Sequence, residues 1–216
     1  MAEIRKQEVR IIVDQATLAG TLALPAGATG IVIFAHGSGS SRLSPRNTFV
    51  AGILQQAGIG TLLFDLLTRE EDAVYARRFD IDLLATRLVG ATRWLATRPE
   101  GKGAALGYFG ASTGAAAALR GAAELGNTIS TVVSRGGRPD LAMPYLEKVL
   151  APTLLIVGEH DREVLQLNRQ AFAQLAPARE LAIVPGATHL FEEPGALEQA
   201  ANLAKEWFLR YLSSSG

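Results

Sequence analysis

The sequence contains no cysteine, which excludes disulfide bonds, thiolate metal sites and a cysteine nucleophile. Neither sign of charge is in excess, because 21 Lys and Arg residues balance 21 Asp and Glu residues. No basic stripe is interleaved with aromatic residues either. A nucleic acid or an anionic membrane is therefore not an expected partner.

Long hydrophobic runs are also lacking, so nothing in the sequence predicts a membrane span. The opening segment MAEIRKQEVR has no apolar core of the kind found in signal peptides. We therefore expect a cytoplasmic protein. No remaining group of His, Asp and Glu has metal-ligand spacing, and we expect neither a metal nor another cofactor.

What is present is typical of a folded domain. The chain has 216 residues, of which 48% are hydrophobic and 19% are charged. This length suffices for one continuous core. We expect one domain over residues 1–216, with residues 212–216 as a frayed tail.

The pattern of hydrophobic residues predicts a mostly parallel sheet. Two β-rich stretches, Glu8–Val13 and Leu18–Leu24, predict an antiparallel hairpin at the sheet edge. Short, nearly all-apolar runs follow, as expected of strands buried on both faces. These runs are Ile31–Ala35, Thr61–Phe64, Ala104–Phe109, Thr131–Ser134, Thr153–Val157 and Glu180–Val184.

Segments with helical spacing separate these strands, and the alternation predicts a doubly wound α/β sheet. The segment between the strands at Thr131–Ser134 and Thr153–Val157 holds at most one short helix, Met143–Leu150, and leaves little or no room for a cap. The longer predicted helices are Asn47–Ala57, Ile81–Ala96, Ser112–Leu125, Val164–Leu175 and Leu197–Leu212.

A GxSxG motif, Gly110 to Gly114, lies between an apolar strand and an Ala-rich helix. This is the setting of a nucleophile elbow, where a sharp turn holds Ser112 in a strained conformation and needs small neighbours. The turn would project the hydroxyl at the carboxyl edge of the sheet. The structural alternative is that Ser112 only caps the helix.

A serine hydroxyl needs a base, and the chain has 3 histidines. Only His189, after the last predicted strand, follows both Ser112 and a candidate acid, in the order Ser, acid, His. The alternative is an ordinary core or surface histidine. His36, which follows the first buried strand, is better explained as a structural loop residue.

Asp161, after the penultimate strand, is the favoured acid that would orient His189. Glu159 and Asp65 remain alternatives, because each also follows a predicted strand.

An oxyanion hole needs two backbone N–H donors. One is expected from Thr113, the residue after the nucleophile. The other is expected from Ser38, with Gly39 as the alternative, in a Gly-rich loop that lets amides converge on an anion. This loop lacks the lysine and the spacing of a nucleotide-binding loop.

Arg135 and Arg138 follow the predicted strand Thr131–Ser134, at the edge of the sheet where the site is expected. One of them could bind a carboxylate or phosphate of the substrate, because arginine holds such groups bidentately. The alternative is a structural ion pair with Asp140, Glu70 or Glu71.

With these residues placed, the chain resembles the dienelactone hydrolase-like branch of the α/β-hydrolase superfamily. The resemblance implies the minimal α/β-hydrolase fold with little or no cap, and a Ser112–Asp161–His189 triad. It rests on segments spread over nearly the whole chain: Phe34–Asn47, Thr61–Glu71, Gly107–Leu119, Val132–Ala142, Pro152–Asp161 and Val184–Leu197.

One position departs from the family pattern. The family resemblance implies a cysteine nucleophile at the elbow, whereas this chain has Ser112. The chain is more similar to a serine subgroup, some members of which are fused to a phosphoribosyltransferase-like domain. The family label is therefore not taken as the reaction.

The expected function is hydrolysis of small carboxylic esters through an acyl-enzyme on Ser112. Thioesters and lactones could be cleaved by the same groups. A halide-dependent perhydrolase shares the triad and would show peroxide-dependent oxidation when a carboxylate is present. A non-catalytic binding or regulatory module on this fold is the alternative from another class. The expected partner is a small-molecule ester, and the helical surface also allows a homodimer.

Overall fold

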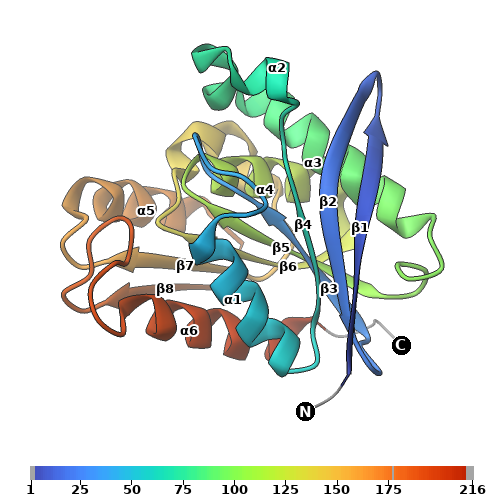
Figure 1. Ribbon diagram of the computed structural model, residues 1–216. Helices are drawn as coiled ribbons and strands as arrows, with labels where there is room; N and C mark the ends of the chain where they lie inside the picture. Colours follow the sequence, from blue (N-terminus) through green and yellow to red (C-terminus); the bar gives the residue numbers. More distant parts are fainter. Residues whose placement is uncertain (1–2, 177, 213–216) are drawn as a thin grey trace.

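The computed structural model describes residues 3–176 and 178–212, which form an eight-stranded sheet with helices on both faces (Figure 1). The strand order is β1-β2-β4-β3-β5-β6-β7-β8. Strands β1, β2 and β4 pair antiparallel in that order, and the remaining pairs are parallel. The strands are β1 (Ile4–Val13), β2 (Ala16–Pro25), β3 (Gly30–Ala35), β4 (Gly60–Phe64), β5 (Ala105–Ala111), β6 (Ile129–Arg135), β7 (Thr153–Gly158) and β8 (Arg179–Val184).

This arrangement confirms the predicted α/β-hydrolase fold with an N-terminal antiparallel hairpin. Helices α1 (Pro45–Gln56) and α6 (Ala196–Tyr211) pack together on one face of the sheet. Helices α3 (Ile81–Ala96), α4 (Thr113–Leu125) and α5 (Arg162–Gln174) cover the other face (Figure 1).

Each face of the sheet has its own hydrophobic core, which explains the all-apolar strands. In β3 every residue is buried. Ile31 and Ile33 pack in the core beneath α3 and α4, whereas Val32 and Phe34 pack in the core beneath α1 and α6. Because alternate side chains of a strand point to opposite faces, a strand covered on both sides has no place for polar residues.

The chain reverses its direction of winding between β3 and β5, and this reversal positions the site. The two strands are parallel neighbours. After β3 the chain enters α1 on one face, and after β5 it enters α4 on the opposite face. The loops therefore diverge at the carboxyl edge of the sheet, where open α/β sheets bind ligands.

Several short helical segments differ from those predicted by the sequence. Helix α2 (Arg69–Asp72) was not predicted, although Thr68 and Glu71 form a capping box at its start. A 3-10 segment, η1 (Tyr75–Phe79), follows it, and another, η2 (Gly126–Thr128), follows α4. The short helix expected at Met143–Leu150 is instead the 3-10 segment η3 (Pro139–Lys148), with Pro144 inside it.

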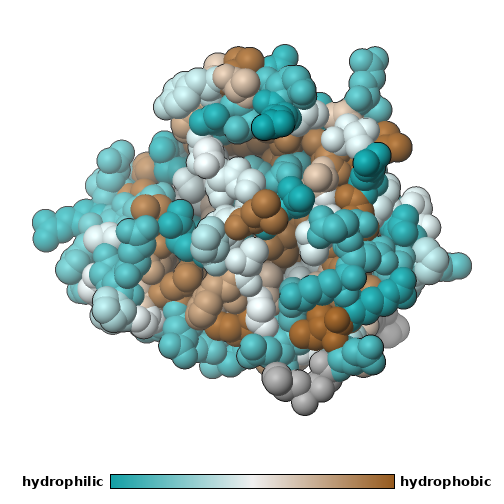
Figure 2. Space-filling view, viewed as in Figure 1, coloured by the Kyte–Doolittle hydropathy of each residue, from teal (hydrophilic) through white to brown (hydrophobic). Residues whose placement is uncertain are grey.

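The described residues form no membrane-spanning helix, and the face viewed in Figure 2 has no broad apolar patch. No helix among residues 3–176 and 178–212 is long and apolar enough to cross a bilayer. Figure 2 shows hydrophobic residues as small separate patches among hydrophilic ones on the face that it views. Leu212 is buried beside Phe208, and the rest of the tail expected to be frayed, residues 213–216, lies outside the described part.

The close contact between α4 and β3 leads to a testable prediction. A Cβ at Gly114 would overlap the backbone carbonyl oxygens of Ala35 and His36. We expect Gly114→Ala to lower the free energy of unfolding by about 3 kcal/mol, because neither backbone segment can move freely. Urea denaturation of the purified variant measures this change.

Gly52→Ala is the matched control. Gly52 lies within α1, and a Cβ there meets no atom within 4 Å. The control is expected to raise the free energy of unfolding by up to about 1 kcal/mol. Equal stability of Gly114→Ala and the wild type would show that the helix is not pressed against β3.

Candidate active site

Ser112 occupies a strained turn between β5 and α4. Its backbone angles are φ 51° and ψ −123°, a region that residues with a Cβ rarely adopt. Such a conformation costs on the order of 1–3 kcal/mol and persists only where the surrounding structure imposes it. Ser112 precedes α4, but its side chain makes no capping hydrogen bond. The alternative that this residue only caps the helix is therefore not supported.

The neighbours of Ser112 explain why the motif contains glycine. A Cβ at Gly110 would overlap the backbone of Ala115, in the first turn of α4. Gly37, on the loop after β3, approaches from the other side, where an added Cβ would lie 3.0 Å from the Ser112 Cβ. The Ser112 N–H also donates to the Arg135 carbonyl oxygen at 3.3 Å. The turn is thus enclosed on several sides.

His189 and Asp161 lie on neighbouring loops at the same edge of the sheet. The His189 Nδ1 atom is 2.6 Å from the Asp161 Oδ2 atom, a short hydrogen bond. The Asp161 side chain is 13% exposed and that of His189 is 39% exposed. Asp161 precedes α5 without capping it, so its carboxylate is directed to the imidazole.

The two alternative acids have other partners. Glu159 accepts a hydrogen bond from the Gly186 N–H at 2.8 Å. Asp65 accepts two hydrogen bonds from Arg42, one from its backbone N–H and one from its guanidinium, both at 2.8 Å. Geometry therefore leaves Asp161 as the carboxylate bound to His189.

Hydrogen bonds hold the loop that carries His189 to two neighbouring segments. The Ala187 carbonyl oxygen accepts the His160 N–H at 2.9 Å. Glu193 accepts hydrogen bonds from the Thr188 hydroxyl and the Thr188 N–H, at 2.6 and 3.1 Å. The hydroxyl contact is the main reason that the pKa of Glu193 is lowered. These contacts limit how far the imidazole can swing.

Ser112 and His189 line the same small pocket, which has a volume of about 240 Å³. Gly37, Ser38 and Gly136 also line it, as do residues at the start of α1. Among the described residues, no hydrogen bond joins the Ser112 hydroxyl to His189. Catalytic hydrogen bonds of this kind are often long before a substrate is bound.

The expected oxyanion donors lie beside Ser112. Thr113 is the first residue of α4, so its N–H has no acceptor within the helix. The Ser38 N–H donates to the Thr113 hydroxyl at 3.0 Å. Ser38 lies in a tight turn in which the Ser40 N–H donates to the Gly37 carbonyl oxygen and Gly39 has φ 68°. The Ser38 amide is therefore near the site but already has an acceptor.

His36 has a structural environment. It is 7% exposed, its Nε2 accepts the Leu66 N–H at 3.0 Å, and its Nδ1 lies 3.0 Å from the Gly37 carbonyl oxygen. Both contacts are satisfied together only by the neutral ring with its proton on Nδ1. Burial lowers the pKa of His36, which keeps this neutral form.

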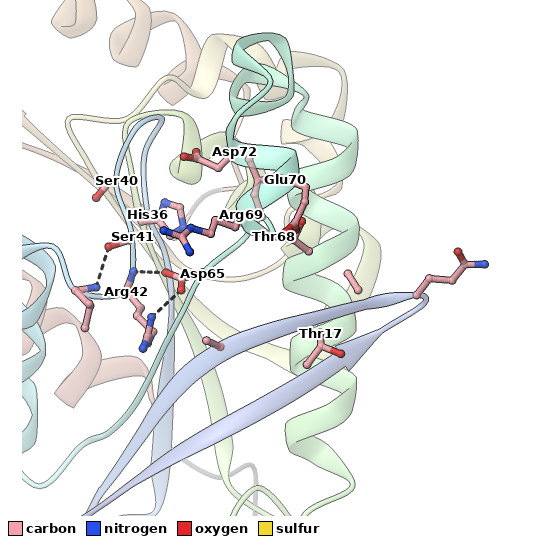
Figure 3. A pocket seen from close by; sticks show the side chains of 15 residues that line it. Thr17, His36, Ser40, Ser41, Arg42, Asp65, Thr68, Arg69, Glu70 and Asp72 are labelled. Carbon is pink, nitrogen blue, oxygen red and sulfur yellow. Dashed lines mark hydrogen bonds and ion pairs between the residues drawn. The ribbon is translucent and has the colours of Figure 1, made fainter.

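A larger groove of the described surface lies beside this pocket, and Ser112 is not among the residues that line it (Figure 3). Its volume is about 990 Å³, and it extends between the start of β2 and the segment Asp65–Asp72. Arg42 and Asp65 point toward one another in its wall (Figure 3). Arg69, Glu70 and Asp72 also line the groove, so its wall carries charges of both signs.

The two arginines singled out in the sequence differ in their partners. Arg138 makes two hydrogen bonds of 2.8 Å to Asp140, so it forms the ion pair of the structural alternative. Arg135 is 8% exposed and lines the pocket with Ser112. Within residues 3–176 and 178–212, no three His, Cys, Asp or Glu side chains form a group that could hold a metal ion.

Comparison with known proteins agrees with the geometry. Residues 18–214 match the dienelactone hydrolase family. The chain belongs to this family. It therefore has the α/β-hydrolase fold.

Two kinds of close relative have different names. A dienelactone hydrolase from Anabaena variabilis, known from its crystal structure, is 56% identical with a TM-score of 0.94, and the match covers 97% of this chain and 99% of that chain. Two Mycobacterium tuberculosis proteins, each named "Putative phosphoribosyl transferase", are 55% identical over 213 residues, which are 99% of this chain and 48% of each relative. The chain thus spans about half the length of these curated relatives.

More distant structures share the fold of this dienelactone hydrolase family member. Est1E from Butyrivibrio proteoclasticus is 16% identical with a TM-score of 0.81, over 94% of this chain and 98% of its own. An esterase from Pyrococcus furiosus is 21% identical with a TM-score of 0.79, over 97% of this chain and 92% of its own. At these identities the likeness shows a common fold.

The buried His36 predicts a dependence of stability on pH. Because its pKa is lowered in the folded state, the unfolded chain takes up this proton at higher pH. The free energy of unfolding should therefore fall as pH decreases below about 6.5, until the folded-state pKa is passed. His36→Gln removes this contribution, while its Oε1 can still accept the Leu66 N–H.

Urea denaturation at pH 7.5 and at pH 5.5 tests this prediction. The wild type should lose more stability than His36→Gln over this interval, by about 1 kcal/mol. Identical losses in the two proteins would mean that the folded state accepts a proton on His36 as readily as the unfolded chain.

Proposed function

We propose that this chain is a serine hydrolase that cleaves small carboxylic esters through an acyl-enzyme on Ser112. The observation that carries the proposal is the 2.6 Å Asp161–His189 pair beside the pocket into which the strained turn presents Ser112. A carboxylate, an imidazole and a hydroxyl gathered at one pocket are the parts that nucleophilic acyl transfer needs.

The reaction follows from the position of each group. The His189 Nδ1–H donates to Asp161, which leaves Nε2 to take the proton of the Ser112 hydroxyl. The Ser112 oxygen attacks the ester carbonyl carbon, and the alcohol then leaves with the proton from His189. A water molecule, deprotonated by His189, attacks the acyl-enzyme, and the acid is released as Ser112 regains its proton.

The Thr113 and Ser38 amides are the proposed donors to the negative oxygen of the tetrahedral intermediate. The Ser38 N–H now donates to the Thr113 hydroxyl. A charged oxygen accepts hydrogen bonds more strongly than a neutral hydroxyl, so the intermediate would draw this N–H toward itself. The N-terminus of α4 adds its positive dipole end at the same point.

The size of the pocket argues for small acyl groups. About 240 Å³ is less than the usual volume of a site for drug-sized ligands. The segment between β6 and β7 forms only η3, which is no substantial cap. Lactones are the second candidate substrates, because a relative that is 56% identical is named a dienelactone hydrolase. Thioesters could be cleaved by the same groups.

Hydrolysis of p-nitrophenyl esters, from acetate to long chains, tests the proposal. We expect the wild type to prefer the shortest esters, and Ser112→Ala to lose turnover by at least about 10³-fold. Circular dichroism and urea denaturation check that the variant is folded. Rates that rise steadily with chain length would contradict the preference for small esters.

Asp161→Asn tests whether the Asp161 carboxylate is the acid that orients His189. We expect kcat to fall by about 10²- to 10⁴-fold, because an amide cannot stabilise the imidazolium. Glu124→Gln is the matched control and should retain activity, because Glu124 is an exposed carboxylate paired with Arg93.

Equal background rates in wild type and Ser112→Ala would favour a lactone or thioester substrate, or the binding-module alternative.

A further inference from the structure

The groove of Figure 3 and the pocket of Ser112 meet at one loop, which follows β3. Gly37 and Ser40 of this loop line the pocket. Ser40 also lines the groove, together with Ser41. A further cavity of about 10 Å³ touches both Gly37 and Leu67 of the groove wall. A ligand that extends from Ser112 across Ser40 therefore enters the groove directly.

The two hollows differ in the size of the group that each can hold. The pocket of Ser112 has a volume of about 240 Å³, whereas the groove has a volume of about 990 Å³ and is open to solvent. An ester has two parts, the acyl group and the alcohol. If a small acyl group occupies the pocket, the groove is the neighbouring space into which a larger alcohol can extend.

Strand β2 gives the groove a floor of small side chains. Thr17 and Ala19 line the groove and are exposed, while Leu18 between them is buried in the core beneath α3 and α4. This division follows from the strand, because alternate side chains point to opposite faces of a sheet. Small residues on the floor leave room for a ligand to lie against the strand.

The walls of the groove present both donors and acceptors of hydrogen bonds. Thr17 lies on β2 at one side, and Arg69, Glu70 and Asp72 lie on α2 at the other (Figure 3). Arginine only donates, ionised carboxylates only accept, and the hydroxyls of Thr17 and Ser40 can do either. A ligand hydroxyl also donates and accepts, so it can bind to each of these groups.

The charges of the groove balance locally, which favours a neutral ligand. The Arg42 guanidinium donates to Asp65 at 2.8 Å, and Asp72 forms an ion pair of 3.0 Å with Arg78. Arg69 and Glu70 are adjacent residues of opposite sign. No single excess charge therefore calls for a counter-ion on the ligand.

Apolar side chains contribute little to the groove. Among the described residues that line it, Leu43 and Leu67 are the large apolar side chains, and none is aromatic. An aryl or long alkyl group would therefore bury little apolar surface here. The lining favours a polar alcohol.

We propose that the groove binds the alcohol part of the substrate, and that this alcohol is a neutral, hydroxyl-rich group such as a sugar or polyol. This proposal rests on the proposed function, because it names the leaving group of the ester that Ser112 cleaves. The small acyl group occupies the pocket, the ester oxygen faces His189, and the polyol crosses Ser40 into the groove. Hydrolysis consumes one water molecule and releases the small acid and the free polyol.

Two acetate esters with similar rings test the proposal by kinetics. The probes are methyl 6-O-acetylglucopyranoside and the acetate of tetrahydropyran-2-methanol, whose ring has no hydroxyl groups. Titration of the released acetic acid measures both rates. For the wild type we expect kcat/KM to be at least about 10-fold higher for the sugar ester, mainly through a lower KM. Equal values, or a preference for the ring without hydroxyl groups, would overturn the proposal.

Ala19→Trp places a large side chain on the floor of the groove. Ala19 is exposed, and its carbonyl oxygen rather than its side chain accepts the Asp65 N–H. We expect kcat/KM for the sugar ester to fall by at least about 10-fold, while that for methyl acetate, whose alcohol is too short to reach the groove, stays unchanged. Arg69→Ala should lower the value for the sugar ester by about 3- to 10-fold, through the loss of hydrogen-bond donors.

Ala173→Trp is the matched control, because Ala173 is an exposed alanine of α5, on the other side of the molecule from β2 (Figure 1). It should keep the wild-type values for both esters. An unchanged value for the sugar ester in Ala19→Trp, or an equal loss for methyl acetate in that variant, overturns the proposal.

A binding experiment keeps this test separate from catalysis. The amide chemical shifts of Ser112→Ala are followed by NMR during titration with methyl 6-O-acetylglucopyranoside. We expect saturable changes at groove residues such as Thr17 and Glu70, and none with the tetrahydropyran ester at the same concentration. Adding Ala19→Trp to this variant should abolish the changes.

The outcomes distinguish the two proposals. Binding of the sugar ester in the groove, without hydrolysis of any ester by the wild type, would uphold the polyol site and reject the esterase. Hydrolysis of p-nitrophenyl esters by the wild type, with no preference for the sugar ester and no changes at the groove, would uphold the esterase and reject the polyol site.

Discussion

The turn from β5 into α4 is the constraint on which the site depends. Ser112 must adopt φ 51° because α4 starts directly against the end of β3. Gly110 and Gly114 permit that contact, and the cores on both faces of the sheet supply the packing that holds it. The same contact brings the loop after β3, with Ser38, to the side of Ser112. Strain at one residue therefore sets the relative positions of the proposed nucleophile and oxyanion donors.

Charge is distributed around the elbow with nearly every group paired. Asp161 is used by His189, Asp140 by Arg138 and Asp65 by Arg42. Arg135 is the exception among the residues that line the described pocket, since its guanidinium has buried nitrogen atoms without a hydrogen-bond partner, and the residue is only 8% exposed. A fixed positive charge near Ser112 would favour the negative charge that develops during attack.

Much of the fold and of the candidate site could be predicted, because apolar strands and the GxSxG motif are visible in short stretches of the sequence. The all-apolar runs predicted β3 and β5, and the order of Ser112, Asp161 and His189 predicted their meeting at one edge of the sheet. Helix α2 was missed, although its signal, Thr68 followed by Glu71, is visible in the sequence. The sequence could not show which of Arg135 and Arg138 forms a structural ion pair, because this depends on which side chain reaches Asp140. Nor does the sequence show that the Thr113 hydroxyl accepts the Ser38 N–H.

Covalent labelling with a fluorophosphonate tests the central claim most directly, because an activated serine attacks this reagent far faster than an ordinary serine hydroxyl does. Peptide mass spectrometry should place one adduct on Ser112 in the wild type, and labelling should be lost or greatly slowed in His189→Ala. Failure to label the folded wild-type protein, or labelling of Ser112 at an equal rate in His189→Ala, would contradict the assignment of Ser112 as a nucleophile activated by His189.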